Sequence, residues 1–200
     1  MILGIDFDNT IIDYSKTFKH VALKDNLIKK NFPSDKQLIK KLLLEKNFEK
    51  KWTQLQGKVY GEEISKAKIY KNCKKILREL NKKKINKFIV SHRTLYPYIG
   101  KKTNLHLSAK NWLKKNNFYD SEINFNHNEI FFEKTKNRKI KKILSLKCTH
   151  FIDDLIEILH SLPDNIIKIH FNVLNKKPIH RLKKNFYVIN NWIEMRNILM

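Results

Sequence analysis

The sequence predicts an α/β fold built on a parallel β-sheet. Short apolar segments alternate with segments of helical periodicity along the 200-residue chain. The first segment, ILGID at residues 2–6, is short, apolar and rich in β-forming residues, as is typical of a strand buried on both faces. Three apolar segments end in polar side chains, and the carboxyl ends of parallel strands meet at one edge of a sheet. The sequence therefore predicts a site at that edge.

The other elements follow from the same periodicities. We expect strands over residues 87–91, 123–125, 130–132, 149–153, 166–171 and 186–189. We expect helices over residues 15–31, 34–56, 64–80, 108–116 and 137–146, a short helix after residue 154, and a last helix from Asn191. Ser34 is the expected N-cap of the second helix, with Gln37 as its capping-box partner.

The composition is strongly basic. The chain has 42 Lys and Arg against 19 Asp and Glu, a net charge of +23. Such a charge is typical of nucleic-acid-binding proteins and would also attract small phosphorylated anions. The surplus is nearly all Lys and is spread along the chain, whereas a dedicated phosphate-binding surface would favour the planar fork of Arg. We therefore favour a compositional origin and keep nucleic acid as a less favoured partner.

The sequence gives no sign of a membrane or secreted protein. It has no run of 18 apolar residues, and its N-terminus lacks the pattern of a secretory signal. Cys73 and Cys148 lie far apart, match no metal-binding spacing and are interpreted as buried apolar side chains in a reducing compartment. We expect a cytoplasmic protein, and the sequence does not indicate an oligomeric state.

The polar strand ends carry the chemistry. Asp6 and Asp8 follow the first strand, Ser91 ends the second, and Asp153 and Asp154 end a later one. Carboxylates brought together at one edge repel each other unless a cation lies between them. Oxygen ligands without His or Cys favour Mg²⁺ over zinc. Each group alone is common in turns, so the inference depends on their order and position.

This ordered set resembles the haloacid dehalogenase (HAD) superfamily of aspartate-nucleophile phosphatases. The first motif of that family falls on Asp6-Phe7-Asp8-Asn9-Thr10, the second on Ser91 and the fourth on Asp153-Asp154. The resemblance covers residues 1–199 and implies a Rossmann-like, three-layer α/β/α core with a central parallel sheet. It also implies a small helical cap inserted after the first strand.

The resemblance assigns a domain organisation. Residues 1–13 and 65–200 would form the α/β core, and residues 14–64 would form the helical cap over the active site. Most of the chain between Ser91 and Lys139 would belong to the core, so a second cap is not expected.

The resemblance also assigns roles to the motif residues. Asp6 would be the nucleophile that forms an aspartyl-phosphate, and would bind Mg²⁺. Asp8 would act as general acid and base, with its backbone carbonyl as a metal ligand. Ser91 would bind a phosphoryl oxygen. Asp153 would bind Mg²⁺ directly, and Asp154 would act through water or outer-shell bonds.

Other candidates are less specific. Thr10 would hold the loop and Asp8 in place at the substrate-binding end of the strand. His92 and Arg93 are candidate substrate-binding residues, with a simple loop role as the alternative. Glu157 is held only as an outer-shell group.

The lysine of the third motif has two candidates. Its cation would neutralise charge on the nucleophile and the phosphoryl group. Lys139 lies fourteen residues before Asp153, the spacing typical of compact family members, and shares a helix face with apolar residues. Lys136 is the alternative.

Together these features predict a Mg²⁺-dependent phosphomonoester hydrolase acting on a small phosphorylated metabolite, such as a sugar phosphate or nucleotide. Asp8 argues against the dehalogenases of the family, which lack an acid at this position. The alternatives are a polynucleotide-end phosphatase that uses the basic surface, a phosphomutase, and a noncatalytic binding protein of the same fold.

Overall fold

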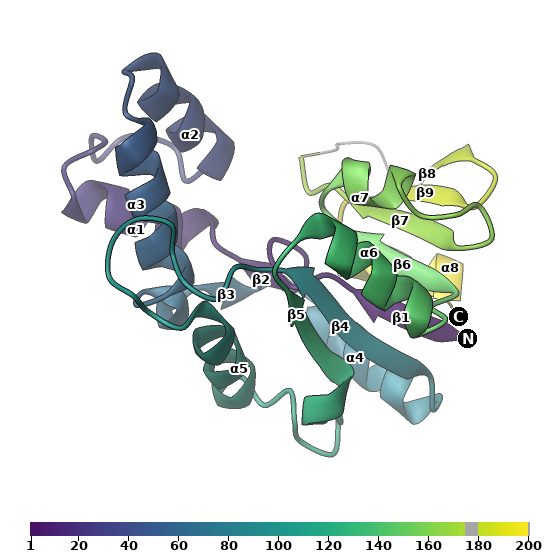
Figure 1. Cartoon of the computed structure of the whole chain (residues 1–200). Helices are drawn as coiled ribbons and strands as arrows, with labels where there is room; N and C mark the ends of the chain where they lie inside the picture. The colour runs from purple at the N-terminus through teal and green to yellow at the C-terminus, as the bar shows by residue number, and fades with distance from the viewer. Residues whose placement is uncertain (175–179, 200) are drawn as a thin grey trace. The chain divides into compact units, whose positions relative to one another are not determined.

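The chain folds into two compact units. A computed structural model describes residues 1–174 and 180–199 (Figure 1). The first of the two units, here called the core unit, comprises Met1–Ile12, Ile69–His92 and Asn117–Met200. The second, called the helical unit, comprises Asp13–Lys68 and Arg93–Asn116.

The core unit is built on a single β-sheet. Its strands are β1 (Ile2–Ile5), β4 (Asn86–His92), β5 (Ile130–Glu133), β6 (His150–Asp153), β7 (Ile167–Phe171), β8 (His180–Lys183) and β9 (Phe186–Ile189). They lie in the order β5-β4-β1-β6-β7-β9-β8. Every neighbouring pair is parallel except β8 and β9, which are antiparallel. The predicted parallel sheet is confirmed, and β1 lies near its centre.

Helices cover both faces of this sheet. They are α4 (Cys73–Lys82), α6 (Lys136–Ser145), α7 (Ile156–His160) and α8 (Arg196–Leu199), with 3₁₀ turns η2 (His127–Glu129) and η3 (Trp192–Met195). In Figure 1, α6 lies in front of the sheet and α4 behind it. The apolar side of α4 is buried through Cys73, Ile76, Leu77 and Leu80, as its helical spacing requires. This is the predicted three-layer α/β/α arrangement.

Two predictions of secondary structure along this part of the chain are wrong. Residues 123–125 form no strand, because the chain turns there with Asn124 at φ 57°. The expected helix over residues 64–80 is divided into η1 (Ile64–Lys66), β3 (Lys68–Ile69) and α4. Asn72, at φ 66°, precedes α4 in a left-handed conformation that an α-helix does not contain. Strand β8 was not predicted.

The helical unit contains α1 (Ser15–Lys24), α2 (Lys36–Glu45), α3 (Glu49–Tyr60) and α5 (Leu105–Lys115). Aromatic side chains join them: the Phe18 ring stacks on Trp52 at 5.3 Å, and Tyr14 meets Tyr60 edge to face at 4.9 Å. The helix predicted over 15–31 is too long, because Asn26 turns the chain at positive φ after α1. The helix predicted over 34–56 is divided at Asn47 into α2 and α3, and α3 continues to Tyr60. Asp35, not Ser34, caps α2, through its carboxylate and the N–H groups of Gln37 and Leu38.

The observed units have other bounds than the predicted domains. The helical unit contains residues 14–64, the predicted cap, but it also contains Asp13, residues 65–68 and residues 93–116, which were predicted to belong to the core. Helix α5 joins this unit through Trp112, which is buried and donates its indole N–H to the Ala67 carbonyl at 3.1 Å. The chain passes between the units at β2 (Ile12–Asp13) and β3, which pair as a two-stranded sheet. That the helical unit acts as a cap remains a prediction.

The cysteines have the environment expected from the sequence. Cys73 and Cys148 are free and buried, and burial raises the pKa of the Cys148 thiol to about 11. Such a thiol stays protonated and poorly reactive at neutral pH.

No helix in the described part of the chain is both long enough and apolar enough to cross a membrane. The cytoplasmic location remains a prediction.

Candidate active site

The sheet places the polar strand ends side by side. β1 pairs with β4 on one side and with β6 on the other, so Ile5 lies in register with Ile89 and Ile152. The Asp6 N–H continues this ladder with a 2.9 Å hydrogen bond to the Ile152 carbonyl. Asp6 and Ser91 therefore meet the end of β6 at one edge of the core unit, as parallel pairing predicts.

The loop after β1 is a tight turn built on Phe7. The Phe7 side chain is fully buried and meets the Phe132 ring edge to face at 5.6 Å. Its carbonyl accepts hydrogen bonds from the N–H groups of Ile11 and Ile12, both at 3.1 Å. Asn9 permits the turn by adopting φ 56°, a left-handed conformation that Asn tolerates. Asp8 is thereby held at the loop and partly exposed.

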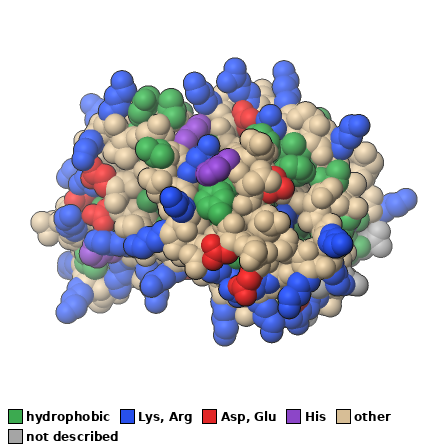
Figure 2. Space-filling model, turned by 90° about the horizontal axis from the view of Figure 1, so that it is seen from below, with side chains coloured by type: hydrophobic (Ala, Val, Ile, Leu, Met, Phe, Trp, Pro, Cys, Tyr) green, Lys and Arg blue, Asp and Glu red, His purple; other side chains and the backbone are tan. Residues whose placement is uncertain are grey.

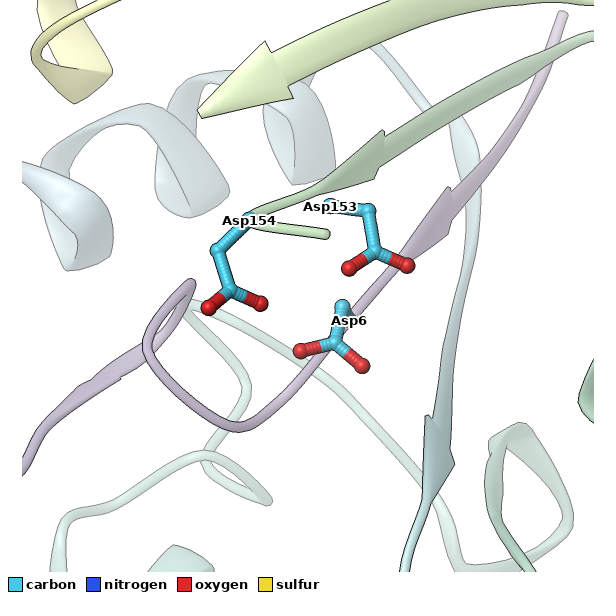
Figure 3. Close-up of side chains that lie close together, drawn as sticks. All are labelled: Asp6, Asp153 and Asp154. Atoms are coloured by element: carbon cyan, nitrogen blue, oxygen red, sulfur yellow. The ribbon is translucent and has the colours of Figure 1, made fainter. Parts of the chain in front are cut away.

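Three carboxylates converge at this edge. Figure 3 shows Asp6, at the end of β1, facing Asp153 and Asp154 at the end of β6. One oxygen from each lies within 4.8 Å of the others. Asp6 and Asp153 are buried, whereas Asp154 is partly exposed. Asp8 contributes no carboxylate to this cluster, and its predicted metal ligand is its backbone carbonyl, which remains a prediction.

Lys139 lies between two of these carboxylates. Its ammonium is 2.5 Å from Asp6 Oδ1 and 2.6 Å from Asp153 Oδ2. The lysine is only 1% exposed, because it lies on the buried side of α6 with Ile143. Ser91 also donates its hydroxyl to Asp6 Oδ1, at 2.8 Å. A single oxygen of Asp6 is therefore held by both the predicted phosphate-binding serine and the predicted lysine.

The two candidates for the motif lysine have different environments. Lys136, one turn earlier on α6, forms an exposed ion pair with Glu157. Lys139 alone of these two contacts Asp6. Glu157 is thus the partner of Lys136, and its outer-shell role remains a prediction.

The cluster has more negative charge than Lys139 alone can neutralise. Burial raises the pKa of Asp6 well above its ordinary value, and the carboxylates of Asp153 and Asp154 add to this increase, while Lys139 opposes it. Burial alone would lower the pKa of the Lys139 ammonium, but the two carboxylates that it contacts raise that pKa instead. The lysine is therefore a permanent cation, and the site favours a second positive charge.

The residues of the cluster fit a hard divalent cation. Within the described chain, the group that could hold a metal consists of Asp6, Asp153 and Asp154, so every side-chain ligand is a carboxylate oxygen. Oxygen ligands of this kind suit Mg²⁺, which is bound through one or two carboxylates, substrate oxygens and water. A cation here would also relieve the repulsion that raises the pKa of Asp6.

The other predicted residues have different positions. Thr10 is fully buried, and its carbonyl accepts a 2.9 Å hydrogen bond from the Trp192 indole. His92 Nε2 lies 3.2 Å from the Lys134 carbonyl, which can only accept, so this nitrogen carries the proton. Arg93 belongs to the helical unit, where it is buried and donates to the Tyr14 hydroxyl at 2.8 Å. Substrate binding by these three residues remains a prediction.

Two contacts of Asp154 were not predicted. Asn9 donates its side-chain amide to Asp154 Oδ2 at 3.3 Å. His170, at the end of β7, places Nε2 3.2 Å from the Asp154 carbonyl. Asn9 belongs to the first motif in the sequence, but that motif predicts no role for its side chain. His170 has no sequence signal, since it depends on the pairing of β7 with β6.

Comparison with known proteins identifies the fold. No protein-family model matches the chain, and no curated protein matches its sequence. A HAD-superfamily hydrolase from Ehrlichia chaffeensis matches with a TM-score of 0.56 and 15% identity over 98% of this chain and 94% of that one. The chain has the fold of HAD-superfamily hydrolases. At such low identity, the similarity establishes the HAD fold and leaves the reaction to the residues of the site.

Two further solved structures are similar to this chain over nearly its whole length. A proposed phosphatase from Clostridium difficile matches with a TM-score of 0.58 and 15% identity, over 100% of this chain and 98% of that one. The proposed HAD hydrolase YfnB from Bacillus subtilis, described as bound to magnesium, matches with a TM-score of 0.52 and 13% identity. That match covers 99% of this chain and 97% of YfnB. The fold implied by the sequence resemblance is thus confirmed.

Proposed function

We propose that this protein is a Mg²⁺-dependent phosphomonoester hydrolase that acts on a small phosphorylated metabolite through an aspartyl-phosphate intermediate. The observation that carries the proposal is the arrangement around Asp6, whose Oδ1 contacts both Ser91 and Lys139 beside two further carboxylates. A sugar phosphate or nucleotide is the expected class of substrate. The HAD fold and the solved neighbours described as a proposed phosphatase and as magnesium-bound support the same reaction.

Asp6 is the proposed nucleophile. Its carboxylate would attack phosphorus, forming an acyl phosphate while the bond to the leaving oxygen breaks. Lys139 and the Ser91 hydroxyl would bind the phosphoryl oxygens and offset the repulsion between two anions. The buried ion pairs of Lys139 support this role, because they fix its ammonium within 2.5 Å of the nucleophile before substrate arrives.

Asp8 is the proposed general acid and base. It follows Asp6 by two residues, is partly exposed and lies outside the carboxylate cluster. It would give a proton to the leaving oxygen and then take one from the water that hydrolyses the acyl phosphate, which regenerates Asp6. The presence of an acid two residues after the nucleophile favours phosphate-ester hydrolysis over dehalogenation.

Asp6, Asp153 and Asp154 would hold the metal ion. When bound, Mg²⁺ would supply positive charge that favours the ionised form of Asp6 and binds an oxygen of the phosphoryl group. The Leu155 N–H donates to Asp153 Oδ1 at 2.9 Å, and Lys139 contacts its other oxygen, so the orientation of Asp153 is fixed by this chain.

The direct test is hydrolysis of p-nitrophenyl phosphate with and without Mg²⁺. We expect Mg²⁺-dependent release of phosphate, and a loss of at least roughly 10³-fold in kcat for Asp6→Asn, as for removal of other nucleophiles. Asp120→Asn, an exposed acid of the same unit, is the matched control and should retain activity. Unchanged activity in Asp6→Asn would contradict the proposal. A phosphate-release screen over a metabolite panel would then find the substrate.

A polynucleotide-end phosphatase is the second candidate, and the net charge of +23 is the observation that favours it. Figure 2 shows Lys and Arg side chains scattered over the displayed face, with Asp and Glu among them, which is closer to a compositional surplus than to a binding stripe. The salt dependence of oligonucleotide binding separates the two candidates. A steep fall in affinity with salt would support a polymer substrate, because neutralised phosphates release counterions.

A further inference from the structure

The side chain of Asn9 makes a contact that its backbone role does not require. Asn9 lies between Asp8 and Thr10 at φ 56°, a conformation that Gly adopts without cost. The turn itself would therefore form with Gly at this position. Instead, the chain has an amide here, and that amide reaches Asp154 Oδ2 at 3.3 Å, across 145 residues of sequence.

The chemistry of the two groups fixes the direction of this hydrogen bond. An ionised carboxylate can only accept, so the amide nitrogen of Asn9 must be the donor. Such a bond stabilises the carboxylate as an anion and limits its rotation. Both properties suit a carboxylate that holds a metal ion, either directly or through a bound water.

Asp154 is also held through its backbone. His170 Nε2 lies 3.2 Å from the Asp154 carbonyl and must donate to it, because a carbonyl only accepts. His170 is on β7, and Asn9 follows β1, so the two contacts reach Asp154 from the strands on either side of β6. The main chain and the side chain of this aspartate are thus positioned by separate elements of the core unit.

We infer that Asn9 is a positioning residue that holds the Asp154 carboxylate in the orientation needed to bind the metal ion. This inference rests on the proposed metal site of Asp6, Asp153 and Asp154, and assigns Asn9 no contact with the reacting atoms. Removing partners of this kind from metal ligands typically weakens metal binding roughly 10- to 100-fold.

Asn9→Gly tests the inference, because it removes the amide and keeps a residue suited to φ 56°. Asn117→Gly is the matched control: Asn117 is exposed, lies in the same unit and has φ 60°. Mg²⁺ affinity is measured by calorimetry in the absence of substrate. Melting temperature without Mg²⁺ checks that both variants fold.

We expect Asn9→Gly to weaken Mg²⁺ binding at least roughly tenfold, and Asn117→Gly to match the wild type. At saturating Mg²⁺, hydrolysis by Asn9→Gly should return to within about threefold of wild type, as expected when only metal affinity has changed. Equal Mg²⁺ affinity of Asn9→Gly and wild type would overturn the inference. So would a wild-type protein that binds no Mg²⁺, which would refute the metal site as well. Weakened binding in a protein that hydrolyses no phosphomonoester would support the role of Asn9 and refute only the proposed reaction.

Discussion

Lys139 of the core unit and Arg93 of the helical unit are buried cations with different partners. In the core unit, Lys139 contacts two carboxylates, Asp6 and Asp153, at 2.5 and 2.6 Å. In the helical unit, Arg93 donates to the neutral hydroxyl of Tyr14 at 2.8 Å and lies over the Tyr60 ring at 5.3 Å. Both cations are almost fully buried.

The different partners indicate different roles for the two cations, a functional role for Lys139 and a structural role for Arg93. Burying a cluster of like charges costs free energy, and the raised pKa of Asp6 reflects that cost. A phenol and an aromatic face hold a cation without adding charge, so they mainly stabilise the packing around it. We therefore expect changes near Lys139 to act mainly on catalysis, and changes near Arg93 to act mainly on stability.

The largest effect should come from the lysine of the core unit. Lys139→Gln removes the cation beside the proposed nucleophile and should lower kcat for p-nitrophenyl phosphate at least roughly 100-fold, as for loss of other transition-state charge stabilisers. Lys136→Gln is the matched control on the same helix. Its exposed ion pair with Glu157 should be worth less than about 1 kcal/mol, and its kcat should stay near wild type.

The opposite effects of these two substitutions would contradict a functional role for Lys139. If Lys136→Gln lost activity and Lys139→Gln kept it, the buried ion pairs of Lys139 would be structural, and the third motif would move one turn along α6. Steady-state kinetics of both variants, with melting temperatures to confirm folding, decide between these outcomes.

The two units also differ in how well the sequence predicted them. In the core unit, strands β1, β4, β6 and β7 were predicted within one or two residues, because strands buried on both faces are short apolar runs. The convergence of Asp6, Ser91 and Asp153 was predicted on the condition that their strands are neighbours in the sheet, and the order β4-β1-β6 meets that condition. The choice of Lys139 over Lys136 was favoured by spacing and helical phase, and the structure places only Lys139 against Asp6.

The helical unit was harder to predict for a physical reason. Its helices end at Asn26 and Asn47, where single residues adopt positive φ, and Asn gives a much weaker sequence signal for this conformation than Gly. The assignment of 93–116 to this unit depends on tertiary contacts such as that of Trp112 with Ala67, which no local pattern shows. The contact of Asn9 with Asp154 was missed for the same reason.

A smaller effect is expected in the pH dependence of stability without metal. The pKa of Asp6 is raised in the folded protein, so the folded state binds a proton that the unfolded state has released above about pH 3.8. The free energy of unfolding should therefore fall as pH rises from that value through the raised pKa, by up to about 1.4 kcal/mol for each pH unit. Urea denaturation of wild type and Asp6→Asn across this range measures the difference.

Asp6→Asn should lose this component of the pH dependence, because its amide does not titrate. Mg²⁺ should reduce the fall in wild type as well, since a cation favours ionised Asp6. If the two proteins had parallel pH profiles, the pKa of Asp6 would not be raised in the folded state. The electrostatic difference between the surroundings of Lys139 and those of Arg93 would then be contradicted.

The smallest effect concerns the helical unit. Tyr14→Phe removes the hydroxyl that accepts from Arg93 and should lower the free energy of unfolding by about 1.5 kcal/mol, the usual range for a hydrogen bond to a charged group. Tyr60→Phe is the matched control, because it keeps the ring face that lies against Arg93. It should therefore cost less. Urea denaturation measures both changes.

The enzymatic activity of Tyr14→Phe distinguishes a structural role of Arg93 from a role in substrate binding. If the contacts of Arg93 are mainly structural, Tyr14→Phe should hydrolyse p-nitrophenyl phosphate with kcat and KM within about twofold of wild type, because the residues proposed to react all lie in the core unit. A large rise in KM at unchanged stability would contradict that expectation. It would mean that Tyr14 serves to orient Arg93 toward substrate, and the binding role predicted for Arg93 from its place two residues after Ser91 would then be supported.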